Sequence, residues 1–312
     1  TESIRDKPTS ELRFHDFLAC RSEVQVVADF GIATVPTHDS IPPPELGQWV
    51  EAHRFESLWF GEHSHIPTSC KTPSPLGGEL PELFKQFYDP FVALTAAAVV
   101  TTKLKVGTGV CLVPEHHTIN LAKAIATLDR ISNGRVVFGI GGGWNAEEMA
   151  DHGVELQDRW QVTRERILAM REIWTKDVAE YHGKFVNFDP IWCWPKPVQA
   201  GGPPVLIGAA SKWVPQRVAE YCDGWFPIDG GYDLAGGIAA IRAEVARRGR
   251  SADALDFSIQ TTEEFAPGGL ENRIPELIKL GFKRIVFLIM QTRRDEQWPL
   301  LERYAALIRQ FT

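Results

Sequence analysis

The sequence predicts a single (β/α)8 barrel, an α/β fold in which eight parallel strands are each followed by a helix. Short β-branched runs alternate with segments of helical period about eight times along the chain. Repeated strand–helix units imply parallel strands, because only a crossover helix returns the chain to the same end of the sheet. The length of 312 residues suits a barrel of ~250 residues with insertions. An open doubly wound sheet is the competing arrangement, since a sequence pattern can miss or invent one element.

The first half of the chain contains four of the expected strands, each a short apolar run that ends in glycine or a polar residue. These strands are expected at residues 24–33, 57–60, 105–113 and 135–140. Helices are expected at residues 44–55, 90–100, around 121–128, from 146 onward, and most strongly at 158–176. In that last helix an apolar stripe is formed by Trp160, Ile167, Met170 and Trp174.

The second half resumes the alternation after an interruption. Residues 177–203 are rich in proline, glycine and large aromatics, and they are expected to form an insertion across one end of the barrel. Strands then follow at 205–208, 224–228, 256–262 and 284–289, with helices at 214–222, 234–248, 273–280 and 299–309. Residues 1–23 are expected to be an N-terminal extension, so that the barrel domain occupies residues 24–312.

Composition excludes several classes of function. The net charge of -7 and the pI near 5.8 argue against a nucleic-acid or anionic-membrane partner. The longest apolar run, residues 91–100, is far shorter than the ~20 residues that span a bilayer. The polar N-terminus has no signal-peptide core, and a cytoplasmic location is expected. Neither a disulfide framework nor a zinc site is expected from the scattered, odd set of Cys20, Cys70, Cys111, Cys193 and Cys222.

Glycines recur where the strands should end, at the side of a barrel that carries its active site. Glycine weakens a strand by about 0.5–1 kcal/mol relative to alanine, so this repetition suggests a backbone that approaches a ligand. The run Gly139–Gly143 is either part of a site or a tight turn; as a dinucleotide fingerprint it is weak, because its glycines follow the fourth strand. The loop Gly208–Ser211 is either a phosphate site at a helix start or an ordinary loop with Ser211 as N-cap.

Two histidines directly follow the second strand. His63 and His65 flank Ser64, and residues two apart in an extended segment face the same side, so both could line a pocket or both could be structural. A metal ion is disfavoured, because there is no clear third ligand and no HExxH motif. No metal site is therefore predicted.

A family resemblance rests on two segments. The stretch KAIATLDRISNGR at residues 123–135, followed by GIGGGWN at 139–145 and by Glu148, resembles the bacterial-luciferase-like oxidoreductase superfamily. Its second signature is similar to residues 204–208 with 219–225. The resemblance covers roughly residues 29–289 and is closest to the branch that depends on coenzyme F420, a deazaflavin. It implies a luciferase-like TIM barrel with an insertion region.

The resemblance also implies an activity. Members use the deazaflavin as a hydride carrier, or reduced flavin mononucleotide (FMN) with O2. The expected function is hydride transfer between F420 and an organic, hydrophobic small-molecule substrate. The alternatives are a two-component monooxygenase that receives reduced FMN from a partner reductase, and a barrel that binds flavin without turnover. Family members are often dimers, so a homodimer is one assembly that the resemblance allows.

The resemblance further implies roles for individual residues. His63 matches a histidine that lies near the reactive ring in several members, and it is the expected catalytic proton donor. A non-prolyl cis peptide is expected at Gly109–Val110, and the Gly208–Ser211 loop is expected to hold a phosphate. Expected cofactor contacts are Thr108, Gly109, Val110, His117, Gly141, Gly142, Gly143, Trp144, Gly208, Ala209, Ala210 and Ser211. Expected substrate-lining residues are Glu62, His65, Trp192 and Trp194, with the loop at 64–81 and the aromatic insertion as a roof.

Two positions depart from the family pattern. Some deazaflavin dehydrogenases carry a glutamate directly after the fourth-strand glycines and use it in proton transfer, whereas this chain has Trp144 there. Dehydrogenation of a sugar phosphate is therefore not expected. Thr118 stands where related chains usually have proline, which should have little effect.

Overall fold

The computed structural model describes residues 28–74, 77 and 79–311, and within them it forms a closed parallel barrel. The predicted fold is confirmed, and the open sheet is excluded because the last strand pairs with the first as well as with its predecessor. Around the ring the strands are β1 (Asp29–Thr34), β2 (Ser57–Phe60), β3 (Lys105–Thr108), β5 (Val136–Gly141), β8 (Val205–Ile207), β9 (Gly224–Trp225), β10 (Asp256–Thr261) and β11 (Arg284–Ile289). The expected N-terminal extension lies outside the described residues.

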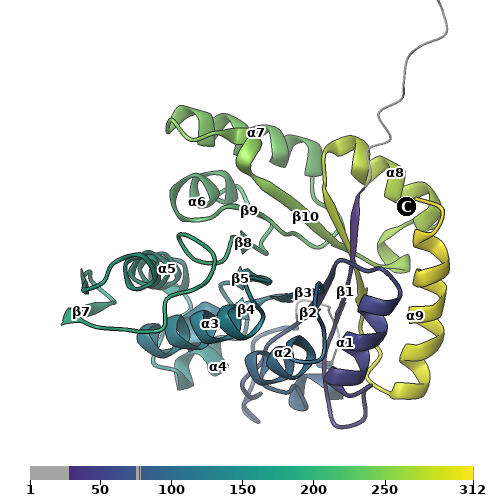
Figure 1. The fold of residues 1–312 in the computed structure, drawn as a ribbon, viewed down its shortest axis with the longest axis horizontal. Coiled ribbons are helices and arrows are strands. Elements are labelled where there is room, and N and C mark those ends of the chain that lie inside the picture. The colour runs from purple at the N-terminus through teal and green to yellow at the C-terminus, as the bar shows by residue number, and fades with distance from the viewer. Residues whose placement is uncertain (1–27, 75–76, 78, 312) are drawn as a thin grey trace, which may run out of the picture.

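A helix follows each barrel strand and lies on the outside of the ring (Figure 1). These helices are α1 (Pro43–Ala52), α2 (Pro90–Ala98), α3 (Thr118–Ile131), α5 (Arg159–Thr175), α6 (Val214–Tyr221), α7 (Leu234–Arg247), α8 (Leu270–Leu280) and α9 (Arg294–Ile308). The short helix α4 (Ala146–Asp151) lies between β5 and α5, and single 3-10 turns are found at Glu82–Lys85, Val113–Glu115, Ala252–Ala254 and Glu263–Phe265. Among the described helices, none combines the length and apolar character that crossing a bilayer requires.

The main core lies between the strands and the ring of helices. The predicted stripe of α5 contributes to it, since Ile167, Met170 and Trp174 are buried, and the Trp174 indole donates to the carbonyl of Ala122 in α3 at 3.0 Å. Trp160, at the start of the same helix, is only partly buried. It lies at the N-terminal end of α5, on the side of the barrel where the strands end.

The inside of the barrel is filled by a second, smaller apolar cluster around Trp59. Its indole packs on Phe226 with ring centroids 4.4 Å apart, and Val137, Leu206 and Val286 complete the layer together with Ala33. Gly107 makes room for the indole, because a Cβ at that position would lie 2.5 Å from ring atoms of Trp59. A filled interior of this kind leaves open space only at the strand ends.

A charged network closes the opposite, N-terminal end of the barrel. Arg284 of β11 is only 5% exposed and donates to both carboxylate oxygens of Glu56, at 2.9 and 3.0 Å, and to Asp256 at 2.8 Å. Burial alone would raise the pKa of Glu56, but the Arg284 hydrogen bonds and charge lower it to about 2. This end is therefore held by ionic contacts, whereas the other end holds the pocket.

Three expectations about individual elements need correction. The third strand is interrupted, because β3 ends at Thr108 and β4 (Cys111–Leu112) resumes after Gly109–Val110, whose peptide bond is cis as expected. The last helix begins at Arg294 and contains Pro299, and α8 likewise starts before its expected residue and contains Pro275. Acidic residues in the first turn, which favour a helix N-terminus, were the missed signal in α9.

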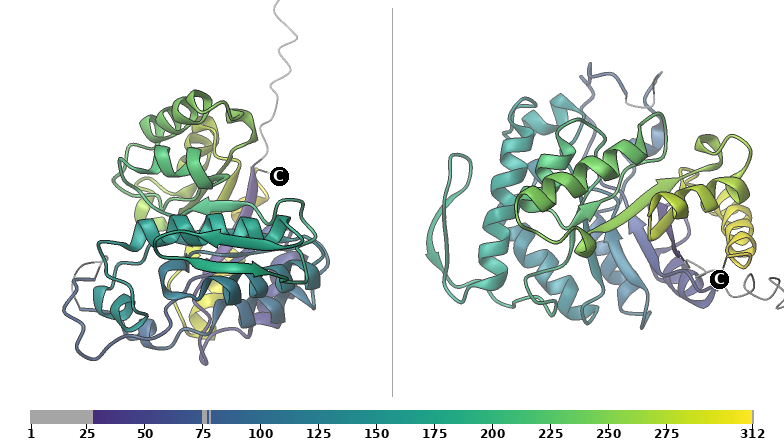
Figure 2. Two further views of the ribbon diagram at one scale, coloured as in Figure 1. Left: turned by 90° about the vertical axis from the view of Figure 1, so that its left-hand side faces the viewer. Right: turned by 90° about the horizontal axis from the view of Figure 1, so that it is seen from above.

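The insertion is a hairpin on the flank of the barrel and does not cross its end. Strands β6 (Ala179–His182) and β7 (Asn187–Ile191) pair antiparallel beside α5. In both views of Figure 2 the hairpin lies on the outer side of the helices, apart from the loop that follows β2. The segment between β2 and α2 is thus the long connection at the active-site end.

Candidate active site

A pocket of about 210 Å³ opens at the C-terminal ends of β1, β2, β3, β10 and β11, where the fold places a site. Its wall is mostly apolar, with a few polar groups that converge on it. The lining residues are Thr34, Val35, Gly61, Glu62, His63, Phe84, Phe87, Gly109, Val110, Leu112, Trp144, Ile228, Gln260, Leu288 and Met290. The structure therefore brings together five of the expected site residues, namely Glu62, His63, Gly109, Val110 and Trp144.

His63 is held by hydrogen bonds on both ring nitrogens. Its Nδ1 lies 2.6 Å from Oε2 of Glu148, and the indole N–H of Trp144 donates to its Nε2 at 3.2 Å. Because Trp144 can only donate, Nε2 must accept, and the proton of the neutral imidazole is on Nδ1. His63 thus presents a basic nitrogen beside Trp144 on the pocket wall and a proton to a carboxylate behind it.

The carboxylate of Glu148 is wholly buried in helix α4. That helix starts shortly after the glycines at the end of β5. The Asn145 side chain caps it by accepting from the backbone N–H of Glu147 and Glu148. Burial would raise the pKa of Glu148, but hydrogen bonds from His63 and from the backbone N–H of Ser64 outweigh it and lower the pKa. In the sequence, Glu148 stands out only as part of a family motif. Its contact with His63 arises from the fold.

A second carboxyl group, that of Glu115, lies behind Glu148. Both of its oxygens are buried, and no N–H or O–H group of the described residues donates to them. Burial raises the pKa of Glu115 to about 9, with the neighbouring charges of Glu148 and Glu62 acting in the same direction. Glu115 is therefore protonated at neutral pH and is able to donate a hydrogen bond to Glu148.

Glu62 lines the pocket, but its carboxylate is bound to the protein. It accepts from the backbone N–H of Leu112 at 2.6 Å and from the imidazole of His116 at 2.8 Å. Burial lowers the pKa of His116, yet the hydrogen bond and charge of Glu62 raise it above its usual value. Cys111 lies within the same cluster, where burial and Glu62 raise its thiol pKa well above the ordinary range. The hydrogen bond between Glu62 and His116 accounts for the short distances within this cluster.

The expected cofactor loops meet at Val110. A Cβ on Gly208 would lie 2.4 Å from one Val110 methyl group, and a Cβ on Gly141 would lie 2.6 Å from the other. Gly143 has a φ of +72°, a left-handed conformation that favours glycine, and it leads into α4. The glycines thus allow Val110, a wall of the pocket, to sit between the two loops.

An aromatic roof comes from the segment between β2 and α2. Phe84 and Phe87 approach His63 with ring centroids 5.2 and 5.3 Å away. The segment is fastened to α4, because the hydroxyl of Thr72 donates to Glu147 at 2.6 Å. The expected roof was the loop at 64–81, whereas Phe84 and Phe87 lie just beyond it, and nothing in the sequence pattern singled out these two residues.

Several expected residues lie elsewhere. Trp192 and Trp194 are 79% and 54% exposed near the β6–β7 hairpin and do not line the pocket, so the insertion provides no roof over it. His65 is at the surface, where it contacts Asp151 at 3.0 Å, and His117 is an exposed residue at the start of α3. Thr108 is buried and donates to the carbonyl of Gly139 at 2.7 Å.

The loop Gly208–Ser211 lies next to the pocket. Ser211 is not the N-cap of the following helix, as the alternative of an ordinary loop had required. Helix α6 begins at Val214, a turn later, and Ser211 accepts only weakly from the N–H of Trp213 at 3.4 Å. The carbonyl of Ala209 accepts from the Trp225 indole at 2.8 Å, while Ala210 is exposed. The loop is therefore held from the barrel side, and its outer side is open.

Comparison with known proteins finds one matching family and relatives that depend on different cofactors. The family described as luciferase-like monooxygenase matches residues 43–263. An uncharacterized protein of Mycobacterium tuberculosis is 35% identical over 285 residues, covering 89% of this chain and 97% of that protein. Partial matches include an FMNH(2)-dependent dimethylsulfone monooxygenase of Pseudomonas putida, 30% identical over 50% of this chain and 44% of that one. An F420-dependent glucose-6-phosphate dehydrogenase of Amycolatopsis mediterranei is 31% identical over 44% of this chain and 42% of that one.

Two solved structures share the fold. Monooxygenase RslO1 from Streptomyces bottropensis superimposes with a TM-score of 0.72 at 17% identity, covering 90% of this chain and 98% of that one. An F420-dependent secondary alcohol dehydrogenase in complex with an F420-acetone adduct gives a TM-score of 0.71 at 13% identity, covering 92% and 99%. At these identities the likeness concerns the fold alone.

Proposed function

The chain belongs to the luciferase-like monooxygenase family, and on that premise we propose that it transfers a hydride between coenzyme F420 and a hydrophobic organic substrate. The observation that carries this proposal is the His63–Glu148 pair at the wall of an otherwise apolar pocket. Hydride transfer to or from a carbonyl, imine or enone must be matched by a proton, and a buried histidine–carboxylate pair is suited to move it.

The residues present fit a deazaflavin. The pocket has an apolar wall at Val110 with polar groups at its edge, which is what a flat heteroaromatic ring requires. Gly109, Val110 and Trp144 would contact the ring, and the open side of the Gly208–Ser211 loop would receive the phosphate. When bound in reduced form, F420 supplies the hydride.

The chain itself would manage the proton. His63 would pass a proton at Nε2 after the Trp144 N–H turns away from that nitrogen, while Glu148 would retain the Nδ1 hydrogen bond and stabilise the imidazolium form. Phe84 and Phe87 exclude water and favour an apolar substrate. Trp144 orients the ring from the other side.

A two-component monooxygenase is the second candidate, favoured by the partial match to the dimethylsulfone monooxygenase. In that case a partner reductase would deliver reduced FMN, and O2 would be the oxidant. His63 would then be a hydrogen-bond donor or acceptor for the oxygenated substrate.

A titration separates the candidates. The purified protein is titrated with F420, its reduced form and FMN, while absorbance and fluorescence are followed. Micromolar affinity for F420 is expected; micromolar affinity for FMN with none for F420 would overturn the proposal in favour of the monooxygenase. If F420 binds but a panel of ketones, imines and enones gives no turnover, a barrel that only binds the cofactor becomes the better explanation.

A further inference from the structure

We propose that the groove between the N-terminal parts of α5 and α6 binds the anionic tail of the cofactor, with Arg217 as the charged contact. The proposal rests on the F420 function above. F420 carries a lactyl and oligoglutamate chain beyond its phosphate, whereas FMN ends at the phosphate. A tail site of this kind would therefore favour F420 over FMN at a place remote from the ring.

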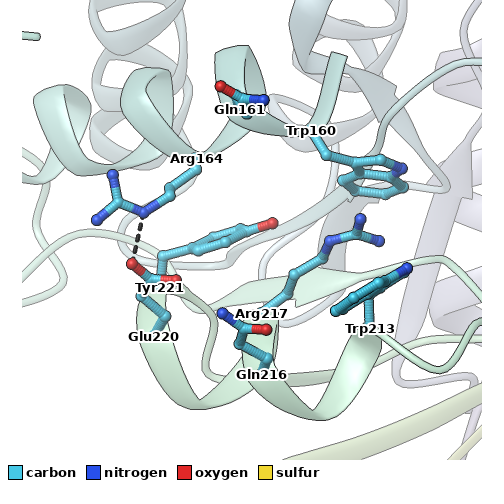
Figure 3. Close-up of a pocket in the computed structure, with 8 residues that line it drawn as sticks. All are labelled: Trp160, Gln161, Arg164, Trp213, Gln216, Arg217, Glu220 and Tyr221. Atoms are coloured by element: carbon cyan, nitrogen blue, oxygen red, sulfur yellow. Dashed lines mark hydrogen bonds and ion pairs between the residues drawn. The ribbon is translucent and has the colours of Figure 1, made fainter. Parts of the chain in front are cut away.

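The groove is separate from the pocket at the strand ends and is larger, about 420 Å³. Figure 3 shows its walls: the indoles of Trp160 and Trp213 lie on the right-hand side of the view, Trp160 above and Trp213 below, with the Arg217 guanidinium between them. The lining residues are Trp160, Gln161, Arg164, Trp213, Gln216, Arg217, Glu220 and Tyr221. Aromatic, amide and cationic side chains of this kind suit a peptide-like chain of carboxylates.

Arg217 is a cation without a counter-ion. Its guanidinium stacks on the Trp160 ring at 3.9 Å from the centroid, and within the described part of the chain it makes neither an ion pair nor a side-chain hydrogen bond. Partial burial lowers its pKa, and the nearby charge of Arg159 acts in the same direction. Stacking holds the guanidinium in place but leaves its in-plane N–H donors unused.

The other described side chains that line the groove do not neutralise Arg217. Arg164 is neutralised by Glu220 at 2.5 Å, so the carboxylate in the groove is already paired and does not serve Arg217. The hydroxyl of Tyr221, a residue only 3% exposed, has no hydrogen-bond partner among the residues described. In Figure 3 it points toward the space beside Trp160 and Arg217. A buried, unsatisfied hydroxyl next to an unpaired cation points to a missing polar ligand.

The groove begins where the cofactor loops end. Trp160 packs against Gly142, since a Cβ on that glycine would lie 2.9 Å from the indole. On the other side, Trp213 follows Ser211 by two residues, and its backbone N–H donates to the Ser211 hydroxyl at 3.4 Å. A chain that leaves a phosphate held at Gly208–Ser211 would therefore enter the groove between the two tryptophans. This continuity favours the cofactor tail over an unrelated anion.

The test is a binding comparison that needs no substrate. Dissociation constants are measured by fluorescence for three ligands: the deazaflavin alcohol without phosphate, F420 with its glutamates removed, and F420 with its natural glutamate tail. The wild-type protein should bind the full tail about tenfold more tightly than the glutamate-free form, as expected for one charged hydrogen bond. That advantage should shrink as salt is raised.

Arg217→Gln should remove the tail advantage while leaving the affinity for the deazaflavin alcohol unchanged, which also shows that the variant is folded. Arg217→Lys should keep part of it. Arg242→Gln is the matched control, because that guanidinium also lies over an aromatic ring, Phe257, but on α7 away from the groove. Equal affinity for the two F420 forms, or an unaltered ratio in Arg217→Gln, would overturn the tail site and leave the F420 function standing. Failure of all three deazaflavins to bind would instead remove the proposed function.

Discussion

His63 and Glu148 are 85 positions apart in the sequence, yet Nδ1 of the imidazole lies 2.6 Å from Oε2 of the carboxylate. The contact joins the end of β2 to the short helix α4 behind β5. It fixes both the tautomer and the direction of the imidazole, so that the acid–base function proposed for His63 depends on a residue that does not itself line the pocket.

His63→Ala should lower turnover by roughly 10²–10⁴-fold while changing the F420 dissociation constant little, because the side chain moves a proton and does not hold the cofactor. Glu148→Gln should cause a smaller loss and should alter the ¹⁵N chemical shifts of the His63 ring, which report its tautomer. Glu155→Gln, an exposed neighbour, is the control. Full turnover in His63→Ala would remove its catalytic role.

Glu115→Gln should make the protein more stable than the wild type at high pH. The pKa of Glu115 is raised to about 9 in the folded protein, well above its ordinary value. The folded state therefore holds a proton that the unfolded state has already released, and wild-type stability falls as pH rises through this interval. Because one pH unit within this interval is worth about 1.4 kcal/mol, urea unfolding at pH 5 and pH 9 should show a relative gain of roughly 3–5 kcal/mol for the variant at pH 9. If the difference in unfolding free energy between variant and wild type is the same at both pH values, Glu115 is charged in the folded protein.

Gly208→Ala should weaken cofactor binding, since the new methyl group would push Val110 out of its place in the pocket wall. The double variant Gly208→Ala with Val110→Ala tests this cause, because it removes the clashing methyl groups. Binding should recover at least partly in the double variant, as measured by the same fluorescence titration. Additive losses would mean that Gly208 is needed for another reason.

Arg284→Met should cost about 2–4 kcal/mol of unfolding free energy at pH 7, because Asp256 loses this ion pair and Glu56 keeps only the more exposed Lys105 as a cationic partner among the described residues. The pKa of Glu56 is lowered to about 2 in the folded state, so its contribution is present above its ordinary pKa and is lost as pH falls toward 2. The difference between variant and wild type should therefore shrink at pH 3. Arg303→Met, at an exposed ion pair with Glu263, should cost less than about 1 kcal/mol.

The fold could be predicted from sequence because its signal is local and repeated. The strand at Ser57–Phe60 and the strand at Arg284–Ile289 have the predicted boundaries, since apolar runs bounded by polar or glycine residues determine them. The start of α9 was predicted too late, at Pro299, because proline suits the entry of a helix, although the acidic residues Asp295 and Glu296 favour the earlier start that the structure has.

The site was predictable only where it coincides with a strand end. His63, Glu62 and Trp144 follow β2 and β5 directly, and the barrel brings them together. Phe84, Phe87 and Glu115 belong to long-range packing that no local pattern encodes. The tryptophans near the hairpin were misplaced because aromatic content alone does not say which side of a helix layer an insertion covers.

Helix α4 has a consequence for the order of events in a catalytic cycle. Through Asn145 it starts at the glycines that are expected to contact the cofactor, through Glu148 it holds His63, and through Glu147 it fastens the segment that carries the phenylalanine roof. A cofactor that fixes the conformation of the glycines would therefore also fix the surface against which a substrate packs. We expect compulsory-order kinetics, with the cofactor as leading reactant and the substrate showing measurable affinity only for the binary complex.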